Sequence, residues 1–426
     1  MTHLAARIAR SVAVVTSLAL VGGGLAACTA AESTTAVDTP TTTVVDASDS
    51  TFWDTGAVHD IAITDADYQA LIDAYLATGD KEWGTATVTI DGTTFHDVGI
   101  KLKGNSTLRV VTSTSDPSTL PWLIDLDKYV DDQHYLDATE LVVRGSSTET
   151  ALNEALALEM LDAAGLASEQ AVPSRISFDG GDQTLRLVIQ NPDGTWDEQQ
   201  FGDDGLIYKA EVGGDYSYRG DDPESYTGVF DQQAGDDDLA PLIAFLKFIN
   251  ESDDATFASD LGTYLDVDSF ATYLAFQDLV DNFDDINGPG NNSYLRYDEE
   301  TGVMTVVSWD LNLAFGTANV DGGGGGAGGG GQRPGGGNPP QGGNGGPQGG
   351  QGREQANVLV DRFLADPDFA ALYAQAKVDL QSELIASGTA QGILDDWVAV
   401  LKAQASDLVP AATVDSEAAA LEEYLG

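Results

Sequence analysis

The sequence contains a single cysteine, Cys28, among 426 residues. One thiol cannot form an intramolecular disulfide, so the fold must be stabilised by its apolar core alone. Basic residues are also scarce, because 19 lysines and arginines stand against 69 aspartates and glutamates and give a formal net charge of −50. This charge repels the phosphates of nucleic acids, and we therefore expect no nucleic-acid partner.

No long apolar run occurs near the start of the chain. The apolar stretch at residues 11–21 is too short to cross about 30 Å of hydrocarbon, and it follows two arginines and no acidic residue, as in a secretory signal. Residues 25–27 (LAA) precede Cys28 and resemble a lipobox, in which the thiol is acylated. We expect a signal peptide at 1–27 and a lipid anchor on Cys28 at the outer face of the cytoplasmic membrane; the alternative is an ordinary signal with a chance cysteine.

Composition divides the remainder of the chain. Residues 28–50 are rich in Thr, Ser, Ala and Asp without apolar periodicity, which is typical of a flexible tether. Residues 321–353 consist almost wholly of Gly, Pro, Gln and Asn, so we expect a disordered insertion that cannot bury a core. The insertion would separate the core, residues 51–320, from a C-terminal helical part of the same domain, residues 354–426. We expect a monomer.

Periodicity predicts short strands and amphipathic helices in irregular order, which favours an α+β fold with a mixed or antiparallel sheet. The expected helices are residues 65–77, 150–164, 239–250, 267–281, 358–364, 369–386, 390–405 and 416–425. The first of these has Thr64 as a candidate N-cap. The expected strands and hairpins are residues 52–63, 86–95, 98–103, 123–126, 140–143, 175–178, 185–190, 206–210, 293–297 and 304–309.

Residues 101–107 read KLKGNST and place two lysines beside a polar turn. Lys101 and Lys103 are two residues apart, so both lie on one face of a strand. Ammonium groups and the backbone N–H groups of such a turn can receive phosphate oxygens. The alternative is a pair of solvent-facing lysines on an exposed strand.

Two later segments carry oxygen ligands. Residues 281–297 (DNFDDINGPGNNSYLRY) leave an apolar helix, pass through a Gly/Pro turn and enter a strand. Carboxylates and carboxamides there suit a hard cation, although the spacing is not that of an EF-hand. A structural cation loop, ordinary turn chemistry and a catalytic role remain open. In residues 306–316 (VVSWDLNLAFG), Asp310 directly follows an apolar strand, where it either caps the next turn or ligates a cation, and a site shared with the first loop is expected.

Together these segments resemble the CotH kinase family over roughly residues 58–316. The matching pieces occur in order and are residues 98–107 (VGIKLKGNST), 124–130 (IDLDKYV), 152–157 (LNEALA), 205–209 (GLIYK), 281–284 (DNFD) and 309–316 (WDLNLAFG). The resemblance implies an atypical protein-kinase-like fold that uses ATP and Mg²⁺ or Mn²⁺.

By this resemblance, the nucleotide phosphates would be held by Lys103, which Glu154 would steady, as the strand lysine and helix glutamate do in kinases. Lys101 is the rival lysine and Glu159 the rival glutamate. Lys209 would either contact phosphate or remain a lone surface cation.

The resemblance also implies that Asp284 accepts the proton of an attacking hydroxyl and that Asn292 and Asp310 hold the metal. The chain would then be an extracytoplasmic kinase that phosphorylates Ser or Thr of surface proteins. The alternatives are a non-catalytic surface binding or assembly protein with the same scaffold and cation site, and a glycan-active enzyme. The chain departs from the family pattern at Gln190 and Asn191, where an acidic residue is expected before a Pro-Asp-Gly turn.

Overall fold

The computed structural model describes residues 42–46, 50–202, 205–211, 213–288, 291–317 and 357–426. Cys28, the expected signal peptide and the Gly-rich segment lie outside these ranges, so the predictions for them stay predictions. The described residues belong to one compact unit, residues 40–426. Among them, no helix has both the length and the apolar character needed to cross a bilayer.

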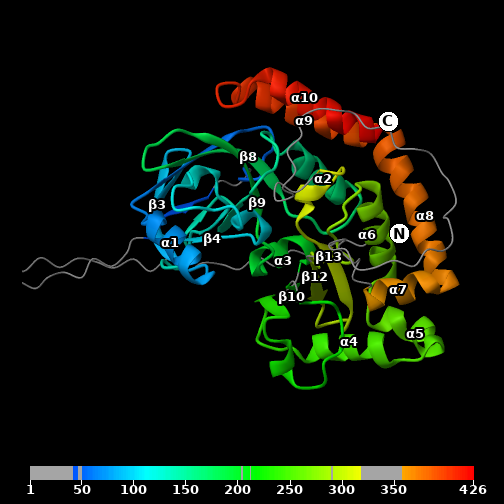
Figure 1. Cartoon of the computed structure of the whole chain (residues 1–426). Helices are drawn as coiled ribbons and strands as arrows, with labels where there is room; N and C mark the ends of the chain where they lie inside the picture. Colours follow the sequence, from blue (N-terminus) through cyan, green and yellow to red (C-terminus); the bar gives the residue numbers. More distant parts are fainter. Residues whose placement is uncertain (1–41, 47–49, 203–204, 212, 289–290, 318–356) are drawn as a thin grey trace, which may run out of the picture. The chain divides into compact units, whose positions relative to one another are not determined.

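Seven strands form a closed barrel (Figure 1). Neighbouring strands are antiparallel except β2 and β8, whose parallel pairing closes the barrel. The hairpin between β3 and β4 turns at Asp91 and Gly92, which have φ values of 48° and 87°, as a tight two-residue turn requires. In barrel order the strands are β2 (His59–Thr64), β3 (Gly84–Ile90), β4 (Thr93–Leu102), β5 (Trp122–Asp125), β7 (Glu140–Val143), β9 (Thr184–Gln190) and β8 (Ala171–Phe178).

A second sheet of four antiparallel strands has its own core with the helices that cover it. Its order is β11 (Phe230–Ala234), β10 (Leu206–Ala210), β12 (Ser293–Tyr297) and β13 (Met304–Ser308). Helix α4 (Ala240–Glu251) packs on β12, and α6 (Val267–Leu279) packs on β13. A separate short parallel pair joins β1 (Val44–Val45) to β6 (His134–Tyr135).

The remaining described α-helices either connect strands along the chain or follow β13. The α-helices are α1 (Tyr68–Thr78), α2 (Leu152–Ala163), α3 (Gly194–Phe201), α5 (Asp254–Asp260), α7 (Val358–Ala365), α8 (Pro367–Leu380), α9 (Thr389–Gln404) and α10 (Ala411–Leu425). A π-helix (Gln381–Ala386) continues α8. The 3-10 turns are Ser106–Leu108, Pro117–Thr119, Pro223–Tyr226, Leu261–Thr263 and η5 (Leu311–Leu313).

Helix α2 is buried along most of its length and contacts both β8 and α9 (Figure 1). Its start is fixed by Glu417 of α10. The carboxylate of Glu417 accepts hydrogen bonds from the backbone N–H of Glu149 at 2.9 Å, from the backbone N–H of Thr150 at 3.0 Å, and from the hydroxyl of Thr150. Helix α10 therefore sets where α2 begins, although it lies more than 260 residues away in sequence.

The expected α+β class is confirmed, and several local expectations are corrected. Helix α1 is capped by Asp67 rather than Thr64. The strand expected at 52–63 begins only at His59, because the buried Phe52 fills the barrel core from a turn. The tether expected at 28–50 contains β1. Helices α3 and α5 and strand β11 were not predicted, because they carry little apolar periodicity.

We predict that Glu417→Ala lowers the free energy of unfolding by about 2 kcal/mol, because it removes a charged acceptor shared by two backbone N–H groups and a hydroxyl. Urea denaturation of the purified variant measures this change. Glu422→Ala, an exposed position on the same helix, is the matched control. Equal effects of the two substitutions would contradict a specific role of Glu417.

Candidate functional site

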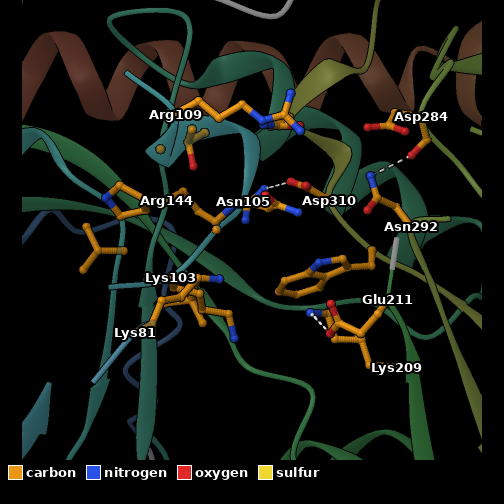
Figure 2. Close-up of a pocket in the computed structure, with 18 of the residues that line it drawn as sticks. Lys81, Lys103, Asn105, Arg109, Arg144, Lys209, Glu211, Asp284, Asn292 and Asp310 are labelled. Carbon is orange, nitrogen blue, oxygen red and sulfur yellow. Dashed lines mark hydrogen bonds and ion pairs between the residues drawn. The ribbon is translucent and has the colours of Figure 1, made fainter. Parts of the chain in front are cut away.

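A pocket of about 290 Å³ is lined by strand ends and loops of both the barrel and the second sheet. Its lining includes five basic side chains in a chain that has only 19, together with three carboxylates, those of Glu211, Asp284 and Asp310. Figure 2 shows two of the lysines on one side of the pocket, opposite an aspartate and an asparagine. The five basic residues are Lys81, Lys103, Arg109, Arg144 and Lys209.

Five of the residues expected at a nucleotide and metal site line this one pocket, namely Lys103, Lys209, Asp284, Asn292 and Asp310. They come from the residue after β4, from β10, from the loop between α6 and β12, and from the segment just after β13. Two further expected residues, Lys101 and Glu154, are absent from the lining. The ammonium of Lys101 instead lies 4.4 Å from the ring centroid of Trp83.

Lys103 has a neutral partner. Its ammonium donates a hydrogen bond to the carboxamide oxygen of Asn191 and lies 5.4 Å from the ring centroid of Trp309. Burial, followed by the charge of Lys209, lowers the pKa of Lys103 to about 7. An anion in the pocket would therefore be attracted by Lys103 and would in turn favour its protonated form.

The expected pairing of Lys103 with Glu154 is wrong, because Arg144 takes that carboxylate. The Nε and Nη2 atoms of Arg144 lie 2.8 Å and 2.7 Å from Oε1 of Glu154, and both side chains are buried. Arg144 directly follows β7, and from there its guanidinium contacts Glu154 in the first turn of α2. The rival Glu159 faces the opposite way and accepts a hydrogen bond from Trp397 of α9.

Arg144 also forms an ion pair with Asp310 (Figure 2). Asp310 has a φ of 62°, a left-handed conformation that costs a non-glycine residue on the order of 1 kcal/mol. This turn ends β13 and directs the carboxylate into the pocket. The next turn is anchored to α2, because the side-chain amide of Asn153 donates to the backbone carbonyl of Asn312 at 2.7 Å.

The loop after α6 is folded back on itself around Asp284. The carboxamide of Asn292 donates to the backbone oxygen of Asp284 at 2.9 Å, and Asn282 accepts from the backbone N–H of Asp284 at 3.3 Å. A Cβ at Gly288 would collide with the Asp284 backbone, so the turn requires glycine there. The fold thus brings Asp284 and Asn292 to the same pocket as Asp310.

Asp310 and Asn292 offer carboxylate and carboxamide oxygens, which are the type of ligand that a hard divalent cation prefers. Among the described residues there is no group of three or more His, Cys, Asp or Glu side chains that could hold a metal by themselves. Mg²⁺ is commonly bound through one or two protein carboxylates together with waters and nucleotide phosphates. The donor set therefore suits a cation that arrives with a phosphate ligand better than a cage made by the protein alone.

The sequence did not single out Arg144 as a residue of this site, although it carried a usable signal, because it directly follows an apolar strand just as Asp310 does. Asn191 was noted only as a departure from the family pattern, and its contact with Lys103, 88 residues away, has no local signal. Glu169 lies outside the lining of the pocket and was not anticipated either. Glu169 is 2% exposed, and burial raises the pKa of its carboxyl to about 8.

A comparison with known protein families matches residues 100–417 to the family described as CotH kinase protein. The match covers more than half of the chain, and the chain therefore belongs to the CotH kinase family. A kinase-like function follows from this membership. A search of curated proteins found no match.

We predict that Arg144→Met lowers the free energy of unfolding by about 3–5 kcal/mol, because it leaves the buried carboxylate of Glu154 without a counter-charge. Adding Glu154→Met should recover much of that loss. Urea denaturation of the two single variants and the double variant measures the coupling. Arg175→Met, which breaks an ion pair to the exposed Asp407, is the control and should cost much less. Strictly additive losses would contradict the pairing.

A second prediction concerns Glu169. Its pKa in the folded protein is about 8, above the ordinary value of 4.5, so the folded state binds a proton that the unfolded state releases. This group therefore makes stability fall as pH rises from about 4.5 to about 8, by up to about 1.4 kcal/mol per pH unit. Glu169→Gln should flatten that part of the stability profile, measured by denaturation at several pH values, whereas Glu198→Gln at an exposed site should leave it unchanged.

Proposed function

We propose that this chain is an extracytoplasmic protein kinase of the CotH type, which transfers the γ-phosphoryl group of ATP to Ser or Thr hydroxyls of surface proteins. The observation that carries the proposal is the convergence of five basic residues with Asp284, Asn292 and Asp310 in one pocket. Cations gathered at one place in an otherwise acidic chain attract an anion, although Arg144 and Lys209 also pair with carboxylates of the protein.

The pocket residues divide into two groups by their chemistry. Lys81, Lys103 and Lys209 are suited to hold phosphate oxygens, and their charges oppose those of a triphosphate. Asp284 is suited to accept the proton of the acceptor hydroxyl. Phosphoryl transfer depends mainly on positioning and charge neutralisation, so no residue needs to form a covalent intermediate.

Asp310 and Asn292 would hold Mg²⁺ or Mn²⁺, whose bound form neutralises phosphate charge. For Asp310 to do so, its ion pair with Arg144 must loosen. The guanidinium would keep its bond to Glu154 and would become available to a phosphate oxygen. The pocket would then lie outside the cytoplasmic membrane, tethered through a lipid on Cys28.

One observation favours a second function. In this structure Arg144 already neutralises Asp310, as it would in a protein that needs no metal. The alternative is therefore a non-catalytic surface binding or assembly lipoprotein that keeps the scaffold.

The deciding experiment incubates the purified chain with labelled ATP and either Mg²⁺ or Mn²⁺, with casein as a general acceptor. We expect phosphate incorporation that Asp310→Ala reduces at least 100-fold, while Asp298→Ala, at the far end of the same hairpin, leaves it unchanged. Absence of incorporation together with absence of any ATP-dependent shift in Tm would overturn the kinase proposal. A shift with metal alone would support the scaffold alternative.

A further inference from the structure

The ammonium of Lys103 is separated from the nearest carboxylate by a carboxamide. Lys103 donates to Oδ1 of Asn191, and Nδ2 of Asn191 donates to Oε2 of Glu140 at 2.6 Å. The three side chains come from the end of β4, the residue after β9, and β7. Asn191 is 7% exposed, so its two hydrogen bonds fix which way the amide points. Its oxygen must face Lys103, because its nitrogen is taken by Glu140.

This arrangement differs from an ordinary lysine–carboxylate ion pair. A direct carboxylate partner would neutralise the ammonium and compete with a bound phosphate for it. A carboxamide orients the ammonium equally well but leaves its charge available. The charges that act most strongly on Lys103 are those of three cations, Lys209, Lys101 and Arg144, and of one carboxylate, Glu140. The lining of the pocket also holds Lys81 and the carboxylates Glu211, Asp284 and Asp310.

We propose that Asn191, anchored by Glu140, is a positioning residue that aims Lys103 into the pocket while leaving the counter-charge to be supplied by a polyphosphate ligand. This inference rests on the proposed function for the identity of that ligand, which is the triphosphate of a nucleotide. The ligand should consequently bind together with a proton taken up by Lys103.

The affinity of the pocket for a polyphosphate should depend on pH. The pKa of Lys103 in the empty pocket is about 7, and a polyanion raises it. Affinity is therefore greatest below pH 7 and falls as pH rises above 7, by at most about tenfold per pH unit for one linked proton. Asn191→Asp supplies a carboxylate from the protein and should remove both the proton uptake and the decline that comes from Lys103.

The first test needs no nucleotide. Lysines of the full chain are methylated reductively with ¹³C-formaldehyde, the Lys103 resonance is assigned with Lys103→Arg, and its pKa is read by NMR titration. Asn191→Asp should raise that pKa by at least one unit, and Glu140→Gln should lower it. Gln183→Glu, an exposed amide-to-acid change, is the control and should have no effect. An unchanged Lys103 pKa in both pocket variants would overturn the inference.

The second test measures Mg–ATP binding by calorimetry at pH 7.5 in two buffers of different ionisation enthalpy. The wild type should take up a fraction of a proton, and Asn191→Asp almost none. Uptake that persists unchanged in Asn191→Asp would also overturn the inference. If the NMR titration shows the expected shifts but ATP does not bind, the positioning role stands and the kinase proposal fails. If ATP binds and the pKa of Lys103 does not change in the Asn191 and Glu140 variants, the positioning role of Asn191 fails and the kinase proposal stands.

Discussion

The buried guanidinium of Arg144 is the interaction on which the site depends. It stands at the end of the barrel strand β7, pairs with Glu154 in the first turn of α2, and reaches Asp310 at the end of β13. A buried charge of this kind is costly unless its partners are held in place. Because the planar guanidinium presents several donors in fixed directions, it ties three elements to one geometry. The barrel, α2 and the second sheet cannot shift independently without exposing or stranding one of these charges.

Part of the site was predictable from sequence, because the polar residues Lys103 and Asp310 closely follow apolar strands. Asp284 and Asn292 lie in the loop between α6 and β12 and were expected from the oxygen ligands of that loop and from the family resemblance. The fold brings all four to one pocket. The sequence does not show which of these side chains pair with one another. Arg144 and Asp310 are 166 residues apart, and Lys103 and Asn191 are 88 apart. No local pattern encodes such distances, and the expected pair of Lys103 with Glu154 was wrong for this reason.

In the fold, too, local elements were predictable and long-range pairings were not. Helices with a clear apolar stripe, such as α4 and α9, were predicted close to their observed bounds. Closure of the barrel through the parallel pairing of β2 and β8 was not predicted, because it joins strands more than 100 residues apart.

The pocket also shows that the net charge of the chain says little about the local electrostatic field. A formal charge of −50 coexists with a cavity whose lining holds more basic than acidic side chains.

The contact of Glu417 with the start of α2 has a consequence for biosynthesis. Every residue that lines the pocket precedes α10 in the chain. A growing polypeptide therefore carries all of the pocket's chemical groups well before it carries the helix that fixes α2. During that interval the backbone N–H groups of Glu149 and Thr150 lack the acceptor that Glu417 supplies in the finished chain. A chain that ends before α10 should therefore hold the start of α2 less firmly than the finished chain does.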